Sequence, residues 1–137
     1  MNISADDPER KRLAARGWHI VDPHRVARTP RKYRSYIASA LGEFTAIKGV
    51  DVTWKTGWVS DRAAAFLATG RPVVTENTGA GEYLPPKCGF HFIDGEDEAA
   101  AAVEEVLADW SRESKFSRRC AVEVFEAQKN LRKILGV

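Results

Sequence analysis

The chain has 137 residues, of which 44% are hydrophobic and 29% charged, and its net charge is +2. This length and composition fit one globular domain with a buried core. No apolar run approaches the roughly 18 residues of a membrane span, and residues 1–13 lack the apolar segment of a signal peptide. We therefore expect a cytoplasmic protein without a membrane span.

The positive charge is concentrated in the first quarter of the chain. Between Arg10 and Arg34 there are nine basic residues and a single acid, Asp22. Such a segment can attract phosphate or nucleic acid, but it lacks the regular aromatic residues of a single-strand binder. We interpret it as the solvated face of two helices and expect no nucleic-acid partner. The basic residues are Arg10, Lys11, Arg12, Arg16, Arg25, Arg28, Arg31, Lys32 and Arg34.

Residues 6–16 predict the first helix, because a proline lies near its first turn and Gly17 follows its last basic residue. The segment WHIV, residues 18–21, predicts a short strand. Asp22-Pro23 should break that strand.

A second helix is predicted to begin at Thr29, which would cap it, with Pro30 at the first helical position. It should end near Gly42. Residues 43–47 alternate in polarity and predict a strand. Residues 50–59 contain alternating apolar residues, but we favour a structured loop there, with little extended structure.

The best-defined stretch of the sequence is a helix followed by a buried strand. Ser60 is placed to cap a helix over residues 60–69, and Gly70 is placed to end it in a left-handed conformation. Residues 72–76 then predict a short buried strand. A glycine-rich loop follows it, with no room for a long helix.

The last part of the chain predicts one more strand and two helices. The strand covers residues 89–93, a helix covers 97–111, and a final helix covers 112–135. Apolar residues recur along the final helix at steps of three and four, which indicates core packing. These residues are Phe116, Cys120, Val124, Ala127, Leu131 and Leu135.

The alternation of helices and strands predicts an α/β fold. We expect a three-layer, Rossmann-like domain over residues 1–137, with a mostly parallel sheet of about four strands, helices on both faces and a long C-terminal helical segment. A response-regulator-like or flavodoxin-like domain has similar layers, but it needs an acidic cluster or a flavin loop that the sequence does not show.

Metal and disulfide chemistry have little support in the sequence. Cys88 and Cys120 lie in unrelated contexts, and no Cys/His spacing matches a zinc site. We expect free thiols, buried or half-buried. His19 and His91 fall in predicted strands and are interpreted as sheet residues. No metal and no cofactor are expected.

Several loop features should meet at the carboxyl ends of the strands, where open α/β sheets bind ligands. A helix N-terminus offers free amides to a phosphate, and glycines let a ligand approach the backbone. Together these features predict a metal-independent nucleotide-diphosphate site. They are Lys48, Gly57-Trp58, the amides of Ser60, Asp61 and Arg62, and Thr78-Gly79.

Five short segments carry a family resemblance. They are YRSYI (33–37), GEFT (42–45), TGWVSDR (56–62), FLATGRPVV (66–74) and NTG (77–79). On these segments, residues 17–137 resemble the C-terminal half of a bacterial glycosyltransferase of the GT-B fold. In that family this half binds the nucleotide-sugar donor, the other half binds the acceptor, and transfer takes place in the cleft between them.

The resemblance implies roles for individual residues. Lys48 and Arg62 would neutralise phosphate charge. Trp58 would stack on the base or shape the pocket, or serve only in packing. Glu82 would contact the ribose or sugar, or be a solvated loop acid. The diphosphate and sugar would be held by Gly57, Ser60, Asp61, Thr78 and Gly79.

The sequence also departs from the family. Many retaining relatives carry two glutamates eight positions apart, and Gly57 and Ala65 stand at the matching positions. Compared with that family, we expect the acceptor half and the first strands of the donor half to be missing, which would make this a domain truncated at its N-terminal side. Such a domain would need an acceptor-binding partner or self-association, and the chain alone is not expected to be active. The alternative is a non-catalytic interaction module with a decayed nucleotide site.

Overall fold

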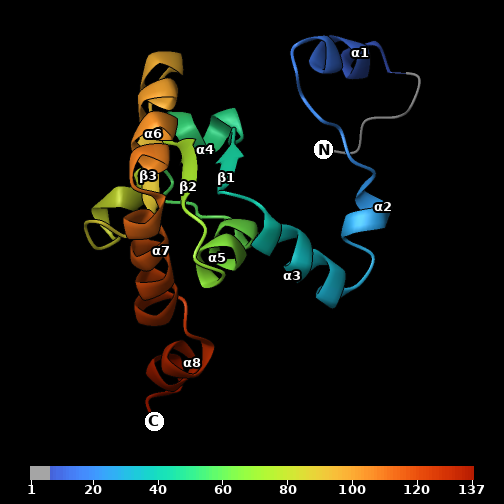
Figure 1. The fold of residues 1–137 in the computed structure, drawn as a ribbon. Coiled ribbons are helices and arrows are strands. Elements are labelled where there is room, and N and C mark those ends of the chain that lie inside the picture. Colours follow the sequence, from blue (N-terminus) through green and yellow to red (C-terminus); the bar gives the residue numbers. More distant parts are fainter. Residues whose placement is uncertain (1–6) are drawn as a thin grey trace. The chain divides into compact units, whose positions relative to one another are not determined.

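A computed structural model describes residues 7–137, which divide into two compact units between Tyr36 and Ile37. The structure is α/β (Figure 1). Its elements in chain order are α1 (Pro8–Ala15), α2 (Pro23–Val26), α3 (Pro30–Ser39), β1 (Glu43–Thr45), α4 (Gly49–Thr53), α5 (Asp61–Ala68), β2 (Val73–Glu76), the 3₁₀ helix η1 (Ala80–Glu82), β3 (Phe90–Ile93), α6 (Glu96–Ala108), α7 (Trp110–Val124) and α8 (Ala127–Leu135).

In the first unit, helices α1 and α2 each begin after an aspartate that caps them. Asp7 Oδ1 accepts a hydrogen bond from the amide of Glu9, and Asp22 Oδ1 accepts one from the amide of His24, both at 2.9 Å. The predicted first helix is confirmed. The predicted strand over residues 18–21 is wrong, because this segment has no strand partner among the described residues.

The second unit contains the sheet. Its strands are all parallel and lie in the order β1-β2-β3, with Phe44 opposite Val74 and Val74 opposite His91. The predicted strands over residues 43–47, 72–76 and 89–93 are confirmed with shorter bounds. The sheet has three strands within residues 7–137, one fewer than expected, since residues 18–21 do not join it.

Helix α6 packs on the sheet to form the main apolar cluster. Val74 of β2 and Ile93 of β3 are buried against Ala102 and Val106 of α6. Helix α6 begins after Gly95 and has three acids in its first turn. Their negative charges interact favourably with the positive end of the helix dipole.

Helices α5 and α7 pack closely against each other. Gly70 has φ +71, and a Cβ there would lie 2.9 Å from the hydroxyl of Ser114. Arg118 donates a hydrogen bond to the carbonyl of Ala68 at 2.9 Å. In Figure 1, α7 continues from α6 past the sheet, and α8 lies beyond it.

Two helical predictions differ from the structure. The loop expected over residues 50–59 contains a helix, α4, which has an acid in its first turn. The final helix expected over 112–135 is divided at Phe125, because Glu126 caps a new helix by accepting hydrogen bonds from two amides. The expected apolar stripe is therefore core only along α7: Cys120 is buried, but Leu131 and Leu135 are exposed.

Candidate functional site

Two loops meet at the carboxyl ends of β1 and β2, as the sequence predicts. The amide of Gly57 donates a hydrogen bond to the carbonyl of Thr78 at 2.7 Å. The hydroxyl of Thr78 donates one to the carbonyl of Trp58 at 2.9 Å. Thr78 is buried. These reciprocal bonds bring together Gly57, Trp58, Thr78 and Gly79 from the predicted site.

The glycines allow the loops to approach each other. Gly79 has φ +84, and a Cβ on it would lie 3.2 Å from the Cβ and the carbonyl oxygen of Lys55. Gly57 has φ +74 and lies against the ring of Tyr83. A side chain at either position would be strained by the backbone conformation and crowded by its neighbour.

Lys55 is the cation that the structure places in this loop cluster. Its ammonium donates to the carbonyl of Asn77 at 2.9 Å and to a carboxylate oxygen of Asp94 at 3.1 Å. The Asn77 side chain donates to the other Asp94 oxygen at 3.1 Å and accepts from the amide of Gly79 at 2.9 Å. The hydrogen bonds from Asn77 and Lys55 hold the pKa of Asp94 below its usual value. Lys55 was not among the predicted site residues, although it stands two positions before Gly57.

The N-terminus of α5 is capped by its own side chains. The Ser60 hydroxyl accepts a hydrogen bond from the amide of Ala63 at 2.9 Å. The Asp61 carboxylate accepts one from the amide of Arg62, also at 2.9 Å. The capping role predicted for Ser60 is confirmed. A phosphate that binds the amides of Arg62 and Ala63 would have to replace these two acceptors.

Arg62 binds strand β1. Its Nε donates to Glu43 Oε1 at 2.5 Å and its Nη2 donates to the hydroxyl of Thr45 at 2.6 Å. Glu43 is buried, and its second oxygen has no hydrogen-bond partner among the described residues. Burial therefore raises the pKa of Glu43, and the hydrogen bond from Arg62 opposes that rise.

Replacing Glu43 with glutamine should alter how stability depends on pH. Because the folded-state pKa of Glu43 is raised, this group binds more protons in the folded than in the unfolded protein, and its contribution to stability falls as pH rises from about 4.5 through the raised pKa. Glu43→Gln lacks that contribution. Its free energy of unfolding, relative to the original chain, should rise across this pH window in urea titrations. A relative fall would contradict the raised pKa.

The remaining predicted site residues lie on the surface. Lys48 precedes α4 in extended conformation, and Glu82 lies in η1. Both are exposed, and neither side chain makes an ion pair with another described residue. Trp58 is half exposed, which leaves part of its ring open to solvent.

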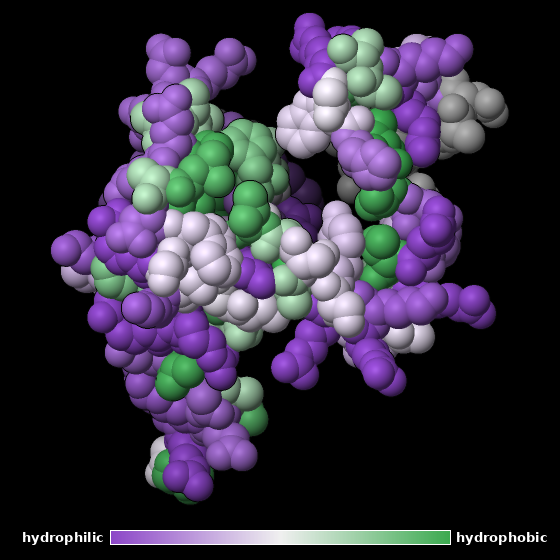
Figure 2. Space-filling view, in the orientation of Figure 1, coloured by the Kyte–Doolittle hydropathy of each residue, from purple (hydrophilic) through white to green (hydrophobic). Residues whose placement is uncertain are grey.

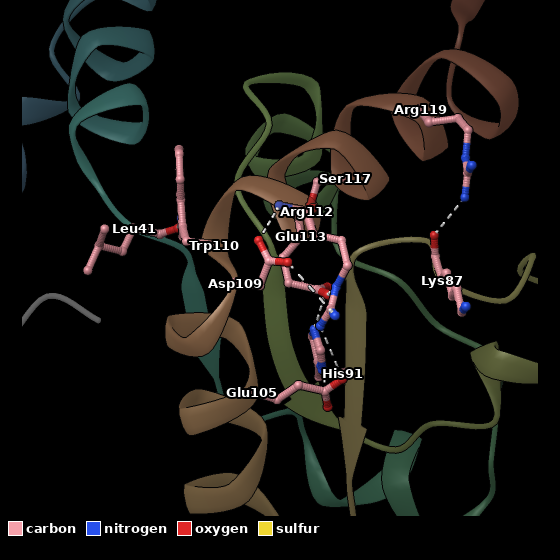
Figure 3. Close-up of polar contacts among 10 residues, drawn as sticks. All are labelled: Leu41, Lys87, His91, Glu105, Asp109, Trp110, Arg112, Glu113, Ser117 and Arg119. Carbon is pink, nitrogen blue, oxygen red and sulfur yellow. Dashed lines mark hydrogen bonds and ion pairs between the residues drawn. The ribbon is translucent and has the colours of Figure 1, made fainter.

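A second polar cluster links β3, α6 and α7 (Figure 3). The buried carboxylate of Glu113 lies 3.1 Å from Nε2 of His91 and accepts from Nε of Arg112 at 3.2 Å. Glu105 lies on the other side of the imidazole, 3.7 Å from Nδ1. The cluster borders a cavity of about 330 Å³ that Lys87 also lines. Sequence reasoning treated His91 only as a strand residue and did not find this cluster.

Neither cluster has the geometry of a metal site. Within residues 7–137, no group of three or more His, Cys, Asp or Glu side chains is arranged to hold a metal ion. None of the helices in that range is long and apolar enough to cross a membrane.

No protein-family model, curated protein or solved structure matches the chain. The GT-B resemblance therefore rests on the short sequence segments quoted above.

Proposed function

We propose that this chain is a donor-binding domain of the GT-B type, which binds a nucleotide diphosphate sugar and requires an acceptor-binding domain for sugar transfer. The observation that carries the proposal is the pair of hydrogen-bonded loops, 55–58 and 77–79, at the carboxyl edge of a parallel sheet. This edge is where open α/β sheets bind ligands. The nucleotide sugar acts as substrate, and the proposal needs no metal or cofactor.

A three-layer, Rossmann-like arrangement, which is part of this proposal, would support the function. Val74 points toward α6, whereas Glu43 and Thr45 of the neighbouring strand bind Arg62 of α5. In the strand register Val74 pairs with Phe44, which lies between Glu43 and Thr45. Successive residues of a strand point to opposite faces, so α5 and α6 would cover opposite faces of the sheet.

The loop cluster offers specific contacts to a diphosphate. The ammonium of Lys55 would exchange its bond to exposed Asp94 for a phosphate oxygen. Gly79, which has no side chain, would let the phosphate reach the backbone. The exposed part of the Trp58 ring would stack on the base. Arg62, which lies in α5, would contribute by linking this helix to β1, since its guanidinium already holds Glu43.

Calorimetric titration with UDP, GDP and their sugars tests the proposal. Lys55→Ala should weaken binding about tenfold, the effect expected for losing one charge-assisted hydrogen bond. Lys115→Ala is the matched control, because Lys115 is exposed on α7 and its loss removes the same charge outside the loop cluster. Equal losses in the two variants would indicate a general effect of charge. No binding by the folded, unmodified chain would contradict the proposed function.

The second candidate is a non-catalytic interaction module with a decayed nucleotide site. Two observations favour it: the amides of Arg62 and Ala63 at the start of α5 are already capped, and Arg62 is paired with a buried carboxylate. Absence of nucleotide binding in the same titration, with an intact fold, would support this candidate.

Either candidate would use a partner at the open edge of the sheet. Phe44 of β1, Leu41, Val103 and Leu107 are exposed and line an apolar groove of about 240 Å³. Figure 2 shows apolar residues gathered over the region of α4 and β1, beside α6. An edge strand with exposed apolar neighbours can pair with another chain. The proposed partner is the acceptor-binding domain or a second copy of this chain.

A further inference from the structure

The segment before β3 lies directly against helix α7. Gly89 has φ +77, and a Cβ on it would lie 2.2 Å from the hydroxyl and 2.6 Å from Cα of Ser117. On the other side of Cys88, the carbonyl of Lys87 accepts a hydrogen bond from Arg119 at 3.2 Å. Cys88 is therefore held between two contacts with α7.

Cys120 lies on the same side of α7. It follows Ser117 by three residues, so the two side chains occupy one face of the helix. Ser117 and Cys120 are 0% and 1% exposed, and Cys88 is 7% exposed. Both cysteines are free thiols. The contacts on either side of Cys88 thus bring two buried thiols close together, from segments more than 30 positions apart in the sequence.

We propose that Cys88 and Cys120 form a reversible intramolecular disulfide when the chain meets a peroxide, with Cys88 as the reacting thiol and Cys120 as the resolving thiol. This modification site is independent of the proposed nucleotide site. It lies where the connection from β2 to β3 reaches α7 and not at the carboxyl edge of the sheet.

Exposure and position assign these roles. Cys88 is 7% exposed and its neighbours Lys87 and Gly89 line a cavity, whereas Cys120 is 1% exposed. In the same direction, the interaction between the two thiols lowers the pKa of Cys88 and raises the pKa of Cys120. Thiolates are the nucleophilic form of cysteine, so Cys88 reacts first.

The reaction balances with one peroxide for each disulfide. The Cys88 thiolate attacks one oxygen of hydrogen peroxide and the O–O bond breaks. The leaving hydroxide takes a proton to become water, and Cys88 becomes a sulfenic acid. The sulfur of Cys120 then attacks the sulfur of Cys88, the S–O bond breaks, and the hydroxide leaves as water with the proton of Cys120. Two thiols are oxidised to a disulfide, and the peroxide is reduced to water.

A cavity lies beside this position. Lys87 and Gly89, the neighbours of Cys88, both line the cavity of about 330 Å³ next to Glu113. Once formed, the disulfide would fix the end of the β2–β3 connection to α7. Cross-links between distant positions restrict the unfolded chain, so the oxidised protein should melt at a higher temperature than the reduced protein.

The test uses the full chain, reduced and then treated with hydrogen peroxide. We expect the intact mass to fall by two hydrogen atoms, both thiols to become unreactive, and a peptide map to join Cys88 to Cys120. Dithiothreitol should reverse all of these changes. Persistence of both free thiols, disulfides only between chains, or a lower melting temperature of the oxidised monomer would overturn the proposal.

Two variants test the assignment of roles. In Cys120→Ser, which keeps a hydrogen-bond donor beside Cys88 but cannot form the disulfide, the sulfenic acid at Cys88 should persist and be trapped by dimedone. In Cys88→Ala, Cys120 should react with peroxide at least about tenfold more slowly. Equal rates in the two variants would overturn the assignment of Cys88 as the reacting thiol. Circular dichroism checks the fold of each variant, and the peptide map of the unmodified chain remains decisive if a variant fails to fold.

Discussion

Gly89→Ala should destabilise the second unit by about 3 kcal/mol or more, because a left-handed backbone and an overpacked contact both oppose the new methyl group. The added Cβ would lie 2.2 Å from Ser117 Oγ and 2.8 Å from the backbone nitrogen of Ser117. The hydroxyl can rotate away, but the backbone of α7 cannot move without disturbing its packing on α5. Urea unfolding followed by circular dichroism would measure the loss.

Gly136→Ala is the matched control, because it measures the cost of the left-handed backbone without an overpacked contact. Gly136 has φ +71, in the same conformational region, and its Cβ would meet no atom within 4 Å. Its substitution should cost about 1 kcal/mol or less. If Gly89→Ala lowered the free energy of unfolding no more than this control, the result would contradict the close approach of Gly89 to α7.

Local signals in the sequence were sufficient to predict helices whose ends are set by neighbouring residues. Ser60 caps α5 and Gly70 ends it with positive φ, so the bounds of this helix depend on residues next to it. Thr29 caps α3 in the same manner, by accepting a hydrogen bond from the amide of Lys32. These predictions needed no knowledge of distant contacts.

The failed predictions have different causes. A strand needs a neighbour, and residues 18–21 have none among the described residues. Residues 50–59 are predicted as a structured loop, but their first residues lie in the short helix α4, where Asp51 also accepts a hydrogen bond from the hydroxyl of Thr56. The division between α7 and α8 followed from a cap at Glu126 that lay inside a continuous apolar pattern.

The candidate site shows the same limit for individual side chains. Glycine and strand positions predicted that loops 55–58 and 77–79 would meet, because parallel strands end at a common edge. They could not predict which cation would lie there. Lys55 is placed by its bonds to Asn77 and Asp94, and Arg62 is held by Glu43. Such pairings depend on the tertiary structure and leave no local pattern in the sequence.

Glu113→Gln should destabilise the second unit by about 2 kcal/mol, the cost of losing a buried acceptor for a charged group. Glu113 is 4% exposed and joins His91 of β3 to Arg112 of α7 (Figure 3). The amide has the same shape but one acceptor fewer, so either His91 or Arg112 would face an N–H group. Urea unfolding of the variant would measure the change.

Glu105→Gln is the matched control, since Glu105 contacts the same side chains at 3.7 and 4.0 Å but lies largely in solvent. Exposed ion pairs contribute roughly 0.5 kcal/mol, so this variant should be nearly neutral. Combining Glu113→Gln with His91→Ala then separates the possible causes. A coupling energy near 1 kcal/mol would assign the loss to the contact between these side chains. Additive losses would instead show that Glu113 stabilises α7 without His91, and the cluster would not link β3 to that helix.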